Sequence, residues 1–219
     1  MEESHLFSDG WGLIEKGGPV MLVLLGLSVI ALAIILVKLY QFARSRLRRT
    51  AFIDPVIGAL NHGDTRGALA RLGESPNPVA RVMETAIETA SDIRLSEADR
   101  DAEISRVGAA EVRNLESFLR GLEVIANLSP LLGLLGTVIG MISAFAKLEG
   151  AGTKVDPAIL AGGIWEALLT TAFGLCVAIP ALAAYYLLEG RVDETRAAMK
   201  DAVTRVLGTY KSTTPAAAE

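Results

Sequence analysis

The segment VIANLSPLLGLLGTVIGMISAFA, residues 124–146, decides the fold class of this chain because it contains no charged side chain. Two further segments are similar: Gly17–Val37 carries no charge, and Pro157–Leu188 carries a single one, at Glu166. A helix needs about 20 predominantly apolar residues to cross the hydrocarbon core of a bilayer. The sequence therefore predicts an all-α membrane protein with three transmembrane helices. Three buried helices of a soluble protein explain runs of this length less well.

The composition of the 219 residues supports this prediction and excludes other classes. The chain is 51% hydrophobic but only 5% aromatic, which suits helices in lipid better than a soluble core. A net charge of −4 gives no electrostatic case for nucleic acid. Cys176 is the single cysteine and there are two histidines, so no disulfide framework, metal cluster or catalytic triad is evident. We expect neither an enzyme nor a metal or cofactor site.

The charges around the first apolar run predict its orientation. Residues 1–16 are acidic, whereas Lys38 and four arginines between 44 and 49 follow the run, so we interpret it as a retained span and not a signal peptide. The positive-inside rule then places the N-terminus outside and residues 44 onward in the cytoplasm. The expected order is an outer N-terminus at 1–16, a first span at 17–43, a cytoplasmic helical domain at 44–122, a second span at 123–146, an outer loop at 147–158, a third span at 159–188, and a cytoplasmic C-terminal helix and tail at 189–219.

The expected cytoplasmic segments have helical patterns. Ser96 with Asp99 is typical of a capping box and opens a run without proline. We expect a continuous helix from Ser96 to Ala146, and a similar extension of the third span to about Val206. Between 44 and 96, the expected helix starts are Asp54, Asp64 and Ser75 or Asn77 with Pro78, and the expected stops are Gly63 and Gly73.

Small residues recur at helical spacing on one face of the second span and one face of the third. Such faces let transmembrane backbones pack closely, so helix packing is their simplest role. They lack a bulky packing partner within one chain, and we therefore expect both spans to line the centre of a homo-oligomeric ring. Pro130 and Pro180 are expected to kink their helices. The small faces comprise Ser129, Gly133, Gly136, Thr137, Gly140 and Ala144 in the second span and Ala167, Thr170, Thr171, Gly174, Ala178 and Ala181 in the third.

The polar residues of these spans are the candidates for chemistry. The hydroxyls of Thr137 and Thr171 can donate and accept hydrogen bonds. A threonine in a membrane helix often bonds only a carbonyl of its own preceding turn, so a functional and a packing role both remain open. Glu166 is costly inside a membrane and is expected to face a bundle interior or a water path. The alternative for Glu166 is a carboxylate that reaches the outer interface.

Two segments resemble the paired core segments of the MotA/TolQ/ExbB proton-channel family. They are PLLGLLGTVIGMISAF, residues 130–145, and GGIWEALLTTAFGLCVAIPALAAY, residues 162–185. IEKGGPVM, residues 14–21, is similar to the start of the first span in ExbB-like and TolQ-like members. Three spans with a short tail resemble the ExbB branch most, and the TolQ branch next, more than the flagellar stator subunit.

The resemblance implies a subunit of a proton-driven motor in the bacterial inner membrane, with a periplasmic N-terminus and a cytoplasmic C-terminus. It implies a homo-oligomer, a pentamer, around the helices of an ExbD-like or TolR-like single-span partner whose membrane aspartate carries the proton. The work would reach a TonB-like or TolA-like protein and energise outer-membrane uptake. By resemblance, Thr137, Glu166 and Thr171 are the pore-lining positions of the proton pathway. The transported ion is then H⁺, no cofactor is needed, and membrane lipid surrounds the chain.

Two alternatives stay open. One is a TolQ-like subunit of the Tol-Pal envelope system. The other is a non-conducting assembly scaffold, which would need the small faces but not Glu166 or the two threonines. A solute transporter would show inverted repeats, and none is visible in the sequence.

Overall fold

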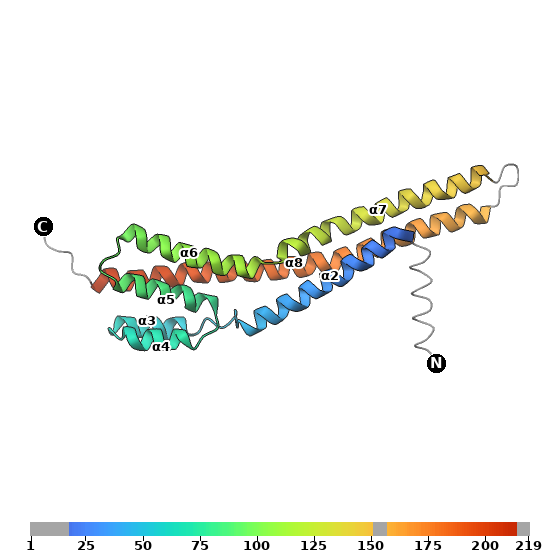
Figure 1. The fold of residues 1–219 in the computed structure, drawn as a ribbon. Coiled ribbons are helices and arrows are strands. Elements are labelled where there is room, and N and C mark those ends of the chain that lie inside the picture. The colour runs from blue at the N-terminus through green and yellow to red at the C-terminus, as the bar shows by residue number, and fades with distance from the viewer. Residues whose placement is uncertain (1–17, 151–156, 214–219) are drawn as a thin grey trace, which may run out of the picture. The chain divides into compact units, whose positions relative to one another are not determined.

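The computed structural model describes residues 18–150 and 157–213, and every regular element in these ranges is an α-helix (Figure 1). The predicted all-α class is confirmed. The expected N-terminal segment 1–16 lies outside the described residues, as do positions 151–156 of the expected loop and the tail from 214. The helices are α2 (Gly18–Arg44), α3 (Ile53–Asn61), α4 (Thr65–Gly73), α5 (Pro78–Ser91), α6 (Glu97–Glu116), α7 (Leu119–Gly150) and α8 (Pro157–Thr213).

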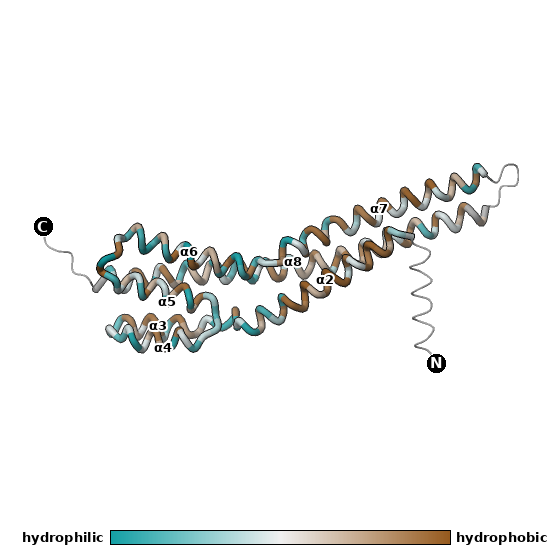
Figure 2. The backbone as a smooth tube through the Cα atoms, viewed as in Figure 1, coloured by the Kyte–Doolittle hydropathy of each residue, from teal (hydrophilic) through white to brown (hydrophobic). Residues whose placement is uncertain are grey.

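Three helical stretches are long and apolar enough to cross a membrane, as predicted. They lie within Gly18–Arg44, Glu97–Gly150 and Leu160–Lys211. Hydrophobic residues are concentrated along α2 and α7 in Figure 2. Large aliphatic side chains on these stretches are exposed, for example Leu131 and Leu168 at 60% each. A surface of this kind is stable against lipid and not against water.

The chain divides into two compact units, each described by itself. The membrane unit comprises Met1–Leu36 and Phe118–Tyr186, and the peripheral unit comprises Val37–Ser117 and Leu187–Glu219. In the peripheral unit, α5 packs against α4 and α6. The core of this unit is a cluster of buried aliphatic side chains that includes Val56, Met83, Ile87, Ala202 and Val206.

Side-chain caps begin three of the helices in the peripheral unit, as the sequence predicts. Asp64 Oδ1 accepts a hydrogen bond from Gly67 N at 2.9 Å and starts α4. Asn77 Oδ1 accepts from Val79 N at 2.9 Å and starts α5, so Asn77 and not Ser75 is the cap. Ser96 Oγ accepts from Asp99 N at 3.1 Å and starts α6. These bonds satisfy backbone donors that have no partner within the helix.

The signals expected at the start of α3 and at the ends of α3 and α4 differ in how well they mark the helix bounds. The cap of α3 is Phe52, and Asp54 lies in the first turn of that helix instead of at its start. Gly63 has a φ of +76°, a conformation that glycine adopts without strain, and the chain turns there after α3. Gly73 is the last residue of α4. A carboxylate in the first turn still interacts favourably with the helix dipole, which is why Asp54 looks like a start signal.

The predicted continuous helix from Ser96 to Ala146 is wrong, because α6 ends at Glu116 and α7 begins at Leu119. Phe118 has a φ of +64°, which residues with a bulky side chain rarely adopt. No glycine or proline marks this break in the sequence. At the other end, α7 continues to Gly150 and α8 begins at Pro157, so helices include both edges of the expected 147–158 loop. The extension of α8 runs to Thr213, beyond the expected Val206.

Candidate functional site: the seam between α7 and α8

In the membrane unit, the backbones of α7 and α8 meet along the small residues that the sequence predicts. A Cβ atom added at Gly133 would lie 3.0 Å from both Thr170 O and Thr171 Cα. A Cβ atom at Gly174 would lie 2.6 Å from Ser129 O. These separations leave no room for a side chain, so the two helices can approach this closely only where glycine is present.

The contact continues in both directions along the same helices. Gly136 lies against the Thr170 side chain, and Gly163 lies against the Ala144 side chain. The two small faces therefore pack against each other within one chain. Because each face is covered by the small residues of the other, the lack of a bulky partner does not by itself argue for a ring, and the ring stays a prediction. We call this contact the α7–α8 seam, and its residues are Ser129, Gly133, Gly136, Gly140, Ala144, Gly163, Ala167, Thr170, Thr171 and Gly174.

Two neighbouring threonines of α8 donate to one carbonyl of α7. Thr171 Oγ1 donates to Gly133 O at 3.1 Å, and Thr170 Oγ1 donates to the same oxygen at 3.3 Å. Thr170 is only 2% exposed and also bonds Ala167 O at 2.7 Å in its own helix. Hydrogen bonds between membrane helices contribute about 0.6 kcal/mol each on average. The two threonine hydrogen bonds therefore add little to stability, and their main effect is to fix how α8 is aligned against α7.

Thr170 is the residue that the sequence left without a role. The resemblance pointed to Thr171, and the only other signal was the placement of Thr170 four residues before Gly174 on the small face. In the structure, the Thr170 side chain fills the space beside Gly136, and it shares the acceptor of Thr171. A second hydroxyl on the Gly133 carbonyl is a tertiary feature that spacing along one helix does not predict.

Thr137 differs from Thr171 in its hydrogen bonding. Its Oγ1 donates to Leu134 O at 2.6 Å, within α7, and the side chain is half-buried. No hydrogen bond joins Thr137 to Thr171 in the described part of the chain. Thr137 is one helical turn beyond Gly133, the residue that accepts from Thr171. A side chain on a helix lies over the preceding turn, so the Thr137 hydroxyl lies close to the turn that Thr171 contacts. The structure thus brings Thr171 into the seam and leaves Thr137 at its margin.

Glu166 lines a groove of about 550 Å³ between α7 and α8. The side chain is half-buried, and Ser143 and Lys147 of α7 line the same groove. Glu166 and Lys147 do not form an ion pair within the described residues. Apart from Ser143, Lys147 and Glu166, its lining consists of glycines, alanines and Trp165, and a groove of this size has room for water beside the two charges. Glu166 lies one turn before Thr170 on α8, and Gly140, Ala144 and Gly163 belong to both the groove and the seam. The groove therefore lies at the end of the seam where Ala144 meets Gly163.

Pro130 and Pro180 lie inside α7 and α8, and both helices continue through them. Each proline lacks an N–H, which removes the normal donor of the carbonyl four residues earlier. Those carbonyls belong to Ala126 and Cys176. Ala178 and Ala181, the two remaining members of the predicted small face of α8, are 5% and 1% exposed.

Three apolar helices and a half-buried carboxylate in a groove beside a glycine seam are features of a membrane protein with an intramembrane functional site. Residues 74–201 match the family described as "MotA/TolQ/ExbB proton channel family". The chain belongs to this family, and the resemblance seen in the sequence is confirmed.

Two ExbB relatives cover most of the chain, and a TolQ relative covers a shorter stretch. It is 31% identical over 191 residues to the "Putative biopolymer transport protein ExbB homolog" of Methanothermobacter thermautotrophicus, an overlap of 87% of this chain and 66% of the relative. It is 30% identical over 213 residues to the "Biopolymer transport protein ExbB" of Pseudomonas putida, covering 90% of this chain and 62% of that protein. It is 45% identical over 83 residues to the "Tol-Pal system protein TolQ" of Haemophilus influenzae, 38% of this chain and 36% of that one. The chain thus spans about two thirds of the two ExbB relatives.

Proposed function

We propose that this chain is the inner-membrane channel and motor subunit of a TonB-type system, acting with an ExbD-like single-span partner. The proton motive force would drive rearrangement of a homopentameric ring around the partner, and a TonB-like protein would carry the work to outer-membrane uptake. The ExbB names of the long matches support this branch. The observation that carries the proposal is the shared carbonyl of Gly133, on which two threonine hydroxyls converge beside the Glu166 groove.

The shared carbonyl suits proton exchange with a carboxyl group on a partner helix. While that carboxyl is protonated, its O–H can donate a hydrogen bond to Thr171 Oγ1, which still donates its own hydrogen to Gly133 O. When the carboxyl ionises, the Thr171 hydroxyl turns and donates to the carboxylate, which is the stronger, charge-assisted bond. Gly133 O then keeps the longer branch of the Thr170 hydroxyl at 3.3 Å, because the single hydrogen of Thr170 is shared with Ala167 O at 2.7 Å. Thr137 has the same option, since its hydroxyl now donates to Leu134 O.

Glu166 has a separate role in this proposal. The groove that it lines contains Ser143 and Lys147 as further polar groups. Water there would connect the outer surface with the seam, and the carboxylate would attract protons. The positive-inside rule places this end of α8 on the periplasmic side, with the C-terminus in the cytoplasm. The ion is then H⁺, and no cofactor is required.

The test replaces the native copy with Thr171→Val or with Glu166→Gln and measures growth on a siderophore-bound iron source. Valine keeps the shape of threonine and removes only the hydroxyl. We expect loss of growth while the ExbD-like partner is still recovered in a pull-down. Thr204→Val is the matched control, because Thr204 is exposed in the peripheral unit and bonds only Lys200 O. Normal growth of both variants, or loss of the partner from the pull-down, would contradict the proton-relay role.

A TolQ-like role in the Tol-Pal envelope system is the second candidate, favoured by the 45% identity over 83 residues to a TolQ protein. Deletion of the gene separates the two. The TonB-type role predicts loss of siderophore-dependent growth with an intact envelope. The TolQ-like role predicts leakage of periplasmic enzymes with normal iron uptake. A non-conducting scaffold predicts that the purified complex carries no proton flux, with or without Thr171→Val.

A further inference from the structure

A pocket of about 780 Å³ in the peripheral unit lies where α2 ends. Arg44 and Arg46 line it from the end of α2 and the turn that follows. Glu74 lines it from the loop after α4, and Arg81 and Glu84 line it from α5. None of these residues belongs to the α7–α8 seam or to the proposed proton pathway.

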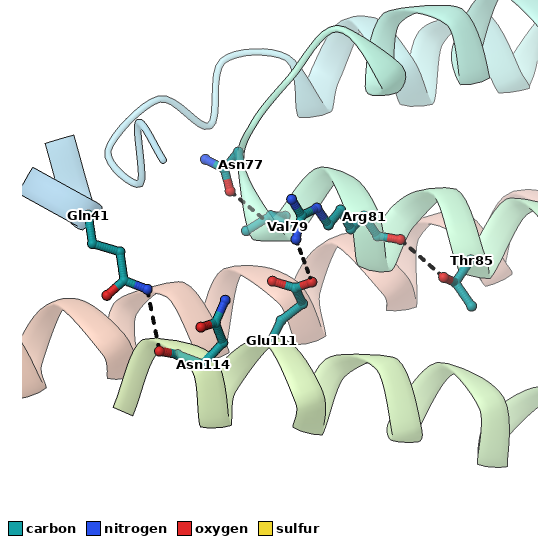
Figure 3. A network of polar contacts seen from close by, with 7 residues as sticks. All are labelled: Gln41, Asn77, Val79, Arg81, Thr85, Glu111 and Asn114. Carbon is teal, nitrogen blue, oxygen red and sulfur yellow. Dashed lines mark hydrogen bonds and ion pairs between the residues drawn. The ribbon is translucent and has the colours of Figure 1, made fainter. Parts of the chain in front are cut away.

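One wall of this pocket is held by Asn77, whose side chain is 1% exposed. Its Nδ2 donates to Arg46 O and to Arg49 O, both at 3.2 Å. Its Oδ1 accepts from Val79 N and caps α5, the contact drawn in Figure 3. The turn after α2 is thereby fastened to the start of α5. Arg46 has a φ of +47°, which residues with a side chain rarely adopt. Tertiary bonds and not local preference therefore place the Arg46 side chain at the pocket.

In the part of the chain that the structure describes, one charged side chain of the pocket forms an ion pair, and four do not. Arg81 Nη1 pairs with Glu111 Oε1 at 2.9 Å, as Figure 3 shows. Arg44, Arg46, Glu74 and Glu84 make no ion pair or side-chain hydrogen bond within the described residues. Two guanidinium groups and two carboxylates thus share one pocket without neutralising each other. A ligand that carries both an anion and a hydrogen-bonding cation would match all four.

The position of Arg44 along α2 points to the source of that ligand. The uncharged run of the first span ends at Val37, and Arg44 follows seven residues later. Seven residues of helix extend roughly 10 Å. The headgroup layer on each side of the hydrocarbon core is about 5–8 Å thick. Because arginine side chains extend toward the interface, Arg44 and Arg46 can reach the lipid phosphates.

We propose that this pocket binds the headgroup of a zwitterionic phospholipid that contains a phosphodiester and a primary ammonium. Arg44 and Arg46 hold the phosphate, and Glu74 and Glu84 accept hydrogen bonds from the ammonium. Phosphatidylethanolamine has this chemistry. Phosphatidylglycerol lacks the cation, and phosphatidylcholine has a quaternary ammonium without an N–H donor. The inference requires only that α2 spans a membrane, and it stands apart from the proposed proton conduction.

The first test measures lipid binding to the delipidated full-length protein by native mass spectrometry. Phosphatidylethanolamine, phosphatidylglycerol and phosphatidylcholine with identical acyl chains are the probes. We expect phosphatidylethanolamine to bind most tightly. Arg44→Gln with Arg46→Gln should weaken it about 25-fold, because one basic residue near a membrane surface contributes roughly a fivefold factor. Arg66→Gln with Arg113→Gln is the matched control, since both are exposed and lie outside the pocket.

The second test separates headgroup recognition from simple attraction of anions. Glu74→Gln with Glu84→Gln should abolish the preference for phosphatidylethanolamine over phosphatidylglycerol without weakening binding of phosphatidylglycerol. Thermal melting followed by circular dichroism checks that each variant is folded. Equal binding of the three lipids, or equal losses in the Arg44/Arg46 variant and its control, would overturn the proposal. Displacement of the lipid by millimolar soluble glycerophosphoethanolamine would contradict binding of a membrane lipid. The pocket would then bind a soluble phosphodiester.

Discussion

The ammonium of Lys38 donates a hydrogen bond to the carbonyl oxygen of Leu115 at 2.8 Å, although the two residues are 77 positions apart. The same nitrogen donates to Gln41 Oε1 at 2.9 Å and to Ser117 Oγ at 3.1 Å. Lys38 is fully buried, and these bonds use all three of its N–H donors. Leu115 O is one of the last four carbonyls of α6, which have no donor within that helix. Lys38 therefore stabilises the end of α6 directly before the break at Phe118.

Lys38→Met tests this role, because it keeps the apolar stem and removes all three donors. We expect a loss of about 1–3 kcal/mol in the free energy of unfolding, the usual cost of leaving a buried carbonyl without a partner. We also expect faster hydrogen exchange of the amides from 113 to 120. Lys200→Met is the control, because Lys200 is exposed on α8. Equal stability and exchange in the two variants would show that Lys38 does not hold the break.

Gly174→Ala tests the closeness of the α7–α8 seam. The added Cβ would lie 2.6 Å from Ser129 O and 3.1 Å from Gly133 Cα, so the helices must separate. Overpacking of this kind costs about 1–3 kcal/mol, and the melting temperature in detergent should fall. Gly190→Ala on the same helix meets no atom within 4 Å, and it should raise stability by up to about 1 kcal/mol. A melting temperature for Gly174→Ala at or above that of the unmodified protein would refute the close contact.

Asn77→Ala should destabilise the protein more than the loss of an ordinary helix cap. Removing a cap costs about 1 kcal/mol, and this is the loss expected for Ser96→Ala at the start of α6. Asn77 also donates to Arg46 O and Arg49 O, so we expect a total near 2–3 kcal/mol. Denaturant unfolding followed by circular dichroism compares the two variants. Similar losses would mean that the two long-range bonds contribute nothing measurable.

The ion pair between Glu97 Oε1 and Lys211 Nζ, at 2.7 Å, predicts a defined pH dependence. Their side-chain hydrogen bond lowers the pKa of Glu97 and raises the pKa of Lys211. The contribution of Glu97 to the free energy of unfolding is fully present when the pH is above the ordinary pKa of 4.5. It is lost as the pH falls through the lowered pKa of the folded state. The contribution of Lys211 to the free energy of unfolding is fully present when the pH is below the ordinary pKa of 10.5. It is lost as the pH rises through the raised pKa of the folded state. The pair therefore stabilises the fold between these two limits.

Glu97→Gln should accordingly lower the melting temperature slightly at pH 7 and have no effect at pH 2, where the native carboxyl is also protonated. The effect at pH 7 should shrink in high salt, because both side chains are exposed. Glu88→Gln, at an exposed residue of α5, is the control. A difference between Glu97→Gln and the unmodified protein that persists at pH 2 would show that the pair does not cause it.

The sequence alone determined the features that depend on neighbouring residues. The uncharged runs were long enough to specify three spans, because the cost of placing a charge in lipid makes such runs diagnostic. Asp64, Asn77 and Ser96 were recognisable as caps, because a cap bonds an amide two or three residues away. Small residues at helical spacing identified the faces of α7 and α8 for the same local reason.

Only the tertiary structure decided the features whose partners are distant along the chain. The break at Phe118 has no local signal, and the donor that supports it, Lys38, comes from another helix. The two small faces pack against each other because α7 and α8 are neighbours in space, which is also why Thr170 and Thr171 share Gly133 O across 37 and 38 residues. The left-handed conformation of Arg46 is held through Asn77, 31 residues away. A local sequence pattern indicates which backbone conformation a residue prefers. Burial and long-range hydrogen bonds determine where the folded chain departs from that preference.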